Sequence, residues 1–159
     1  MVDERRSDIE RDGDDEAIRR VLVEVASLTG MGFVAVAQIA DTRWIACHIL
    51  DQIDFGMSPG DELRVSTTIC NDIRESGNAV VIGDASSESE WNTHPAPSLY
   101  GFRSYASVPI ILPDGSFYGT LCALDSQPRL LAVPGVVPAL HAFSVRVADI
   151  LSRRQLPSE

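Results

Sequence analysis

The segment that decides the fold is residues 105–125, YASVPIILPDGSFYGTLCALD. Residues 105–112 and 117–125 are rich in β-branched and aromatic side chains, and the Pro-Asp-Gly-Ser sequence between them is a strong turn signal. The pattern therefore predicts an antiparallel hairpin. Gly119 lies inside its second strand, where the lack of a side chain lets another element approach closely.

Three further β-rich runs surround this hairpin. Residues 32–40 and 42–50 are separated by little more than Asp41, which predicts a second tight antiparallel hairpin. Residues 79–82 predict a short buried strand, and residues 53–60 read as a loop because they contain two glycines and a proline.

Helical periodicity appears at both ends of the chain. Residues 14–29 place apolar side chains on one helical stripe, and Gly30 is positioned to end that helix. Residues 66–76 predict a short helix, and Pro138 suits the first position of a last helix. The two long stripes are Ile18, Val21, Leu22, Val25 and Leu28, and Leu140, Phe143, Val147, Ile150 and Leu151.

Residues 85–104, the lid segment, form a long connection that is rich in aromatic residues and is expected to fold over as a lid. The order of elements predicts an α+β domain. It has a central antiparallel sheet of five or six strands, the N- and C-terminal helices on one face, and the lid and short helix on the other. We expect a single domain over residues 14–155, a disordered acidic tail at 1–13 and a C-terminal tail at 156–159.

Composition excludes several classes of partner. The net charge of the 159 residues is −10, so phosphate backbones and anionic lipid are repelled, and neither nucleic acid nor a membrane is an expected partner. The three cysteines show no framework spacing, which favours a reducing compartment. No signal peptide and no 18-residue apolar run occurs, so we expect a cytoplasmic protein.

A series of short motifs spans residues 15–155 and resembles a GAF domain. The matching motifs are residues 67–70, 76–82, 84–85, 94–95, 100–105, 108–110 and 114–125. The pattern is similar to the GAF sensor modules of bacterial sensor histidine kinases and diguanylate cyclases. The resemblance implies a GAF/PAS-like fold and a non-catalytic sensory module of signal transduction, such as a two-component system. It would bind a small molecule between sheet and lid and relay through its terminal helices to an output domain.

The residues expected to line the ligand site come from the sheet, the short helix and the lid segment. Arg103 is a cation of the lid that would meet a carboxylate or phosphate, or that instead pairs with Asp84 or a lid acid and holds the lid closed. The aromatic residues line a cavity or simply fill the space. The full set is Trp44, Cys70, Asp84, Trp91, His94, Tyr100, Phe102, Arg103 and Tyr105.

The sequence names no cofactor and predicts no metal site. Covalent bilin attachment is not expected, because the lid segment contains no cysteine and the Cys47-His48 pair lies in the early hairpin. His94 and His48 are open both to axial haem ligation and to plain hydrogen bonding. Free methionine-R-sulfoxide reductases are GAF enzymes, and Cys70 matches one of their cysteines. The position of their catalytic cysteine falls near Pro97, so we expect no enzyme.

A homodimer through the two terminal helices is also expected. The predicted contacts are Val21, Val25, Leu140, Phe143, Val147 and Ile150, with further apolar positions at Val23, Ala26, Ala139, Val145 and Ala148. Two alternatives remain open for the function. One is a ligand-free structural dimerisation or relay module, and the other is a thiol-based redox sensor that uses Cys70 or an enzyme similar to the methionine sulfoxide reductases.

Overall fold

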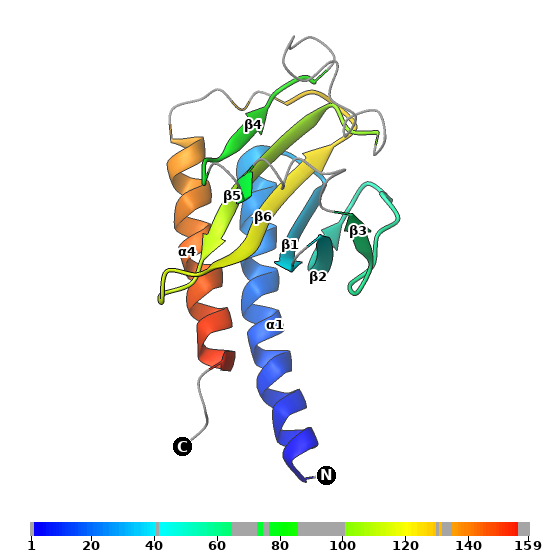
Figure 1. Ribbon diagram of the computed structural model, residues 1–159. Coiled ribbons are helices and arrows are strands. Elements are labelled where there is room, and N and C mark those ends of the chain that lie inside the picture. The colour runs from blue at the N-terminus through cyan, green and yellow to red at the C-terminus, as the bar shows by residue number, and fades with distance from the viewer. Residues whose placement is uncertain are drawn as a thin grey trace.

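The centre of the protein is one antiparallel sheet of six strands in the order β3-β2-β1-β6-β5-β4 (Figure 1). The computed structural model describes residues 2–40, 42–64, 73–74, 77–85, 101–129, 131 and 135–155. Its helices and strands are α1 (Val2–Thr29), β1 (Phe33–Ala40), β2 (Arg43–Asp51), β3 (Glu62–Arg64), β4 (Val80–Ile82), β5 (Ser104–Ile111), β6 (Phe117–Asp125) and α4 (Val136–Gln155). The predicted α+β fold with an antiparallel sheet is confirmed.

The hairpin that decides the fold joins β5 to β6 through the predicted turn. Asp114 Oδ1 accepts hydrogen bonds from the hydroxyl of Ser116 (2.6 Å) and from its backbone N–H (2.9 Å). Both bonds lower the pKa of Asp114, and the bond from the Ser116 hydroxyl has the larger effect. Gly115 adopts a φ of +90°, which a residue without Cβ tolerates best. The side chain of Asp114 therefore holds the turn that aligns the two strands.

The predicted close approach at Gly119 is confirmed. Gly119 pairs with Gln38 of β1 on one side and with Ile110 of β5 on the other. A Cβ at this position would overlap the carbonyl oxygen of Ala37. Only glycine therefore lets β6 pack this closely against β1.

Helices α1 and α4 run antiparallel to each other and cover one face of the sheet (Figure 1). The start of α1 and the end of α4 extend in the same direction beyond the sheet. Their apolar stripes pack on the strand residues that face them, among them Val34, Val108 and Leu121. Burial of these aliphatic side chains is the main driving force that holds the helices on the sheet.

This packing already buries most of the residues that were predicted to contact a second copy. Val21, Val25 and Val147 are fully buried within a single chain, and Leu140 and Ile150 are nearly so. These five residues stabilise the core of one copy, and Phe143 is half-buried against the same core. Because they are already covered, a second copy would have to contact other residues of the two helices.

Other differences concern the ends of elements. Helix α1 begins at Val2, so residues 2–13 continue the helix where a disordered tail was expected. The apolar periodicity from Ile18 onward marks where α1 packs, and it carries no information about how far the helical backbone continues. Strand β3 was not predicted, since three residues are too few to show an alternating pattern. Of the predicted helix over residues 66–76, Ile73 and Arg74 are described and are helical, and the rest lies outside the described residues.

Within the part of the chain that the structure describes, neither helix is long and apolar enough to cross a bilayer.

Candidate functional site

The sheet face opposite α1 and α4, here called the second face, carries its own layer of buried side chains. Because side chains alternate along a strand, every second residue of β1, β2, β5 and β6 points to this side. The buried members of the layer are Phe33, Ala35, Ala37, Ile39, Trp44, Ala46, Ile73, Ile82, Ala85, Phe102, Tyr105, Cys122 and Leu124. An apolar layer backed by a rigid sheet is a suitable floor for a small-molecule site.

Three of the sequence-predicted ligand residues lie on the second face. Trp44, Phe102 and Tyr105 are all buried there, and the rings of Phe102 and Tyr105 lie 5.2 Å apart between centroids. Cys70, Trp91, His94 and Tyr100 lie outside the described residues. Tyr105 pairs with Leu124 at the level where β1 begins, whereas Trp44 pairs with Ile39 near the end of β1. The structure therefore places Trp44 at the opposite end of the strands from Phe102 and Tyr105.

The second face contains two unsatisfied polar atoms. Among the described residues, Trp44 Nε1 and Ser107 Oγ are the buried side-chain nitrogen and oxygen atoms that lack a hydrogen-bond partner. Ser107 points to the second face because its neighbours Ala106 and Val108 both pack under the helices. Buried polar groups are nearly always paired, so each of these atoms is able to bond a polar group of a ligand. Ser107 was missed from the sequence, although the alternation from Tyr105 places it on this face.

Arg103 and Asp84 form an ion pair at the edge of this face. Arg103 Nη2 donates to Asp84 Oδ2 at 2.9 Å, and Arg103 Nε donates to Asp84 Oδ1 at 3.3 Å. The pairing of Arg103 with Asp84, one of the two predicted alternatives, is therefore what the structure shows. Two-point pairing fixes the plane of the guanidinium group. The pair joins the residues that flank the two ends of the lid segment.

A loop that follows β2 covers another part of the second face. Phe55 packs on Phe33 with 4.8 Å between ring centroids, and Met57 and Leu63 contact the same layer. Asp51 holds the loop, since its carboxylate accepts backbone N–H groups of Ile53 (3.2 Å), Phe55 (3.0 Å) and Gly56 (3.0 Å). Burial raises the pKa of Asp51, but these hydrogen bonds outweigh it and the net pKa is lowered.

The described cysteines sit within strands. Cys122 is buried in β6, and Cys47 is half-buried with its Sγ 3.6 Å from the hydroxyl of Tyr118. The described ranges hold no group of three or more His, Cys, Asp or Glu side chains that is arranged to bind a metal ion.

The family follows from a comparison with known protein domains. A family model described as the GAF domain matches residues 15–148. The chain belongs to the GAF domain family. GAF domains are generally regulatory and non-catalytic parts of signalling proteins. The family predicted from the sequence motifs is confirmed.

Solved GAF domains share this fold. The GAF domain of a two-component sensor histidine kinase from Bacillus halodurans is 11% identical, with a TM-score of 0.67 over 87% of this chain and 93% of that chain. The GAF domain of PixJ from Thermosynechococcus elongatus, in its blue-light-absorbing form, is 13% identical, with a TM-score of 0.65 over 92% and 91%. At these identities the similarity concerns the fold alone.

One stretch resembles a curated protein. It is 51% identical over 39 residues to the diguanylate cyclase DgcP of Escherichia coli K12. The match covers 24% of this chain and 11% of the length of DgcP. The chain therefore spans only a small part of that protein. GAF domains thus occur in signalling proteins whose output domains include kinases and diguanylate cyclases.

Proposed function

We propose that this GAF domain is a non-catalytic sensory module that binds a small molecule on the second face, beneath the lid segment, and relays binding through α1 and α4. The output domain would be a histidine kinase or a diguanylate cyclase in a cytoplasmic signalling protein. The residues proposed to contact the ligand are Trp44, Cys70, Asp84, Trp91, His94, Tyr100, Phe102, Arg103 and Tyr105, now joined by Ser107.

The observation that carries the proposal is the pair of unsatisfied polar atoms on an otherwise apolar face. Trp44 is 4% exposed and Ser107 is fully buried, yet neither polar atom has a hydrogen-bond partner among the residues that the structure describes. A buried donor without an acceptor costs about 1–3 kcal/mol, which a ligand acceptor would recover. Between them the floor is made of small side chains, Ala35, Ala37 and Cys122, on which a flat ligand would lie.

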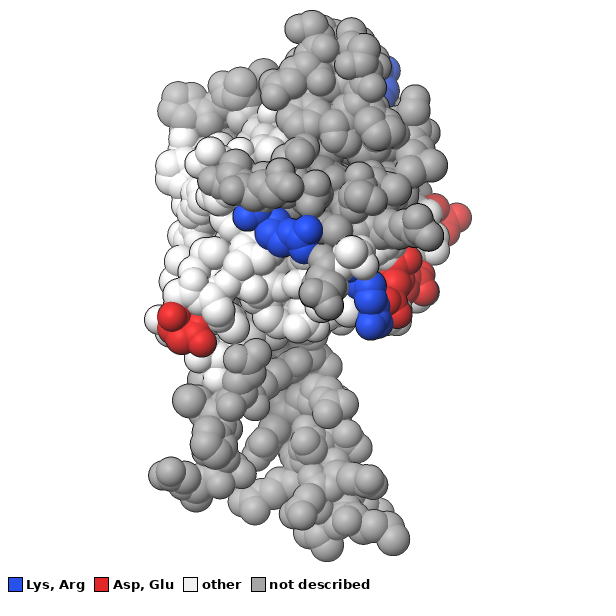
Figure 2. Space-filling view, viewed as in Figure 1, with Lys and Arg blue, Asp and Glu red and all other residues white. Residues whose placement is uncertain are grey.

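Charge supports a small molecule over a nucleic acid. On the face shown in Figure 2, the described charged side chains form a few small separate groups. Nucleic-acid binding requires a continuous basic surface along the phosphate backbone. The net charge of −10 points the same way.

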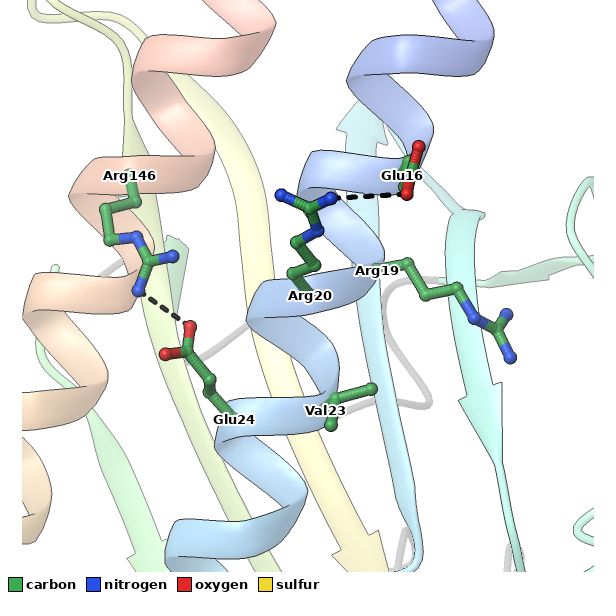
Figure 3. A pocket seen from close by; sticks show the side chains of 6 residues that line it. All are labelled: Glu16, Arg19, Arg20, Val23, Glu24 and Arg146. Carbon is green, nitrogen blue, oxygen red and sulfur yellow. Dashed lines mark hydrogen bonds and ion pairs between the residues drawn. The ribbon is translucent and has the colours of Figure 1, made fainter.

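Dimerisation through the helices is proposed at a groove between α1 and α4. The groove has a volume of about 520 Å³ and is lined by Glu16, Arg19, Arg20, Val23, Glu24 and Arg146. Figure 3 shows Arg146 of α4 reaching Glu24 of α1, where Nη1 and Oε2 lie 2.8 Å apart. Val23, which lines the groove, is 46% exposed, and Val145 of α4 is a further exposed apolar side chain (61%). A second copy related by a two-fold axis fits a surface that carries both signs of charge, because each acid then has a base to meet.

The test of ligand binding is native mass spectrometry of the full chain purified from its own host, with a visible absorption spectrum of the same sample. The expected result is an added small-molecule mass that is released on denaturation. Trp44→Phe and Ser107→Ala should reduce the bound fraction, whereas Ser126→Ala, an exposed serine, is the matched control and should not. A protein that carries no added mass, and whose melting temperature does not change with host metabolite extract, overturns the ligand proposal.

The absence of a bound small molecule would favour a structural relay module. Phe102 and Tyr105 already pack on each other and are buried, as expected of a face whose aromatic residues fill the space. Such a module would still dimerise through α1 and α4, and it would bind no small molecule.

A further inference from the structure

The two ends of the lid segment are tied to each other by short contacts. Besides the ion pair between Arg103 and Asp84, the backbone N–H of Ala85 donates to the carbonyl oxygen of Arg103 at 2.6 Å. We call Asp84, Ala85 and Arg103 the lid base. Since three hydrogen bonds connect its two sides, the lid base is expected to move as one unit.

The lid base is attached to Asp125 at the end of β6. The backbone N–H of Arg103 donates to the carbonyl oxygen of Asp125 at 2.9 Å. The carboxylate of Asp125 is 3% exposed, and its Oδ2 accepts the N–H of Gly32 at 2.9 Å while Oδ1 accepts that of Gln127 at 2.9 Å. Gly32 lies in the turn between α1 and β1. Asp125 therefore bonds the lid base through its main chain and the turn after α1 through its side chain.

Arg129 provides a second connection to the same helix end. Its Nε donates to the carbonyl oxygen of Gly30 at 2.8 Å, and its Nη2 donates to Asp125 Oδ2 at 3.3 Å. Its backbone N–H donates to the carbonyl oxygen of Gly83 at 3.0 Å, next to the lid base. Gly30 ends α1 with a φ of +73° and donates to the carbonyl oxygen of Ala26. Arg129 thus connects Gly83, directly after β4, to Gly30 at the end of α1.

We propose that Asp125 and Arg129 couple the lid base to the C-terminal end of α1 and act as positioning residues for signal output. This inference rests on the proposed function, in which a ligand acts beneath the lid segment and the signal leaves through the helices. A displacement of Arg103 pulls on the main chain of Asp125, and the buried carboxylate passes it to Gly32 and Arg129. Packed groups joined by several hydrogen bonds transmit such shifts because no bond can adjust alone.

The experiment is hydrogen–deuterium exchange on the full chain without any ligand. Arg103→Met removes the ion pair of the lid base and is expected to speed exchange of the amides at residues 26–32 about tenfold. Arg129→Met should speed exchange there by itself, and adding Arg103→Met to it should then have a smaller effect at 26–32 than Arg103→Met has alone, because only the connection through Asp125 is left. Both arginines are partly exposed (48% and 34%), so both variants are expected to fold.

The matched control is Arg43→Met, which breaks the ion pair of Arg43 with Glu62 on the β2–β3 edge. It should leave exchange at residues 26–32 unchanged. If Arg103→Met speeds exchange at 84–85 and 101–103 but not at 26–32, the coupling is refuted. It is also refuted if exchange in β5 and β6 speeds up as much as exchange at 26–32, because the effect would then be a general loss of stability. Since no ligand is present, this result is independent of whether native mass spectrometry finds one.

Discussion

The hydroxyl of Ser144 in α4 donates a hydrogen bond of 2.6 Å to the carbonyl oxygen of Pro109 in β5. Both groups are buried, so this bond is a polar contact inside the apolar interface between helix and sheet. It sets the position of α4 along β5, which apolar packing alone constrains less sharply because it is not directional.

Ser144→Ala is therefore expected to lower the free energy of unfolding by about 1–3 kcal/mol, because the carbonyl of Pro109 is left buried without a donor. Ser107→Ala is the matched control in the adjacent strand. Its hydroxyl is equally buried but has no partner, so its removal should leave stability unchanged or raise it by up to about 1 kcal/mol. Urea denaturation of both variants measures the difference. Equal losses for the two would show that the Ser144 bond contributes nothing specific.

Gly119→Ala is expected to be destabilising by about 1–3 kcal/mol, as overpacking in a core usually is. The new methyl group would overlap the carbonyl oxygen of Ala37, which belongs to a central strand and has little freedom to move. Gly77→Ala separates this effect from backbone strain, since Gly77 has a φ of +71° but open space around it. Thermal unfolding should show a larger fall in melting temperature for Gly119→Ala than for Gly77→Ala. A larger fall for Gly77→Ala would contradict the packing explanation.

Much of the fold followed from local patterns. Strand β6 was predicted with its observed bounds, and the turn at Asp114 was predicted because turn-forming residues act locally. Strand β3 and the start of α1 were missed because neither has an apolar pattern of its own. Strand β3 forms through its pairing with residues such as Trp44.

The site was predictable only in part. Alternation along strands placed Trp44 and Tyr105 on one face, but whether the indole N–H of Trp44 finds an acceptor depends on atoms brought there by the tertiary fold. The same holds for Arg103, whose choice between a ligand and Asp84 was open in the sequence. Asp125 and Arg129 were not singled out, because a carboxylate four residues before an arginine is common and its partners at Gly30 and Gly32 are far away in the chain.

Val145→Glu is expected to weaken self-association through the helices about tenfold or more, because a two-fold axis would bring two new like charges on α4 close together. The side chain is 61% exposed, so the fold of one copy should be unaffected. Ile111→Glu, an exposed apolar residue of β5 that does not line the groove, should leave association unchanged. Sedimentation equilibrium gives the dissociation constants. A wild-type constant for Val145→Glu would place the interface elsewhere.

The carboxylate of Asp51 makes stability dependent on pH in the acid range. Its pKa is lowered in the folded protein because the backbone hydrogen bonds from Phe55, Gly56 and Ile53 outweigh the effect of burial. The stabilisation is therefore fully present above the unfolded-state pKa of about 3.9, and it is lost as the pH falls from there through the lowered folded-state value. Asp51→Asn cannot accept all three N–H groups and is expected to be less stable at pH 7 by about 1–2 kcal/mol. Urea denaturation between neutral pH and pH 3 should show the two proteins converging in acid. A constant difference across that range would show that the Asp51 charge does not hold the loop.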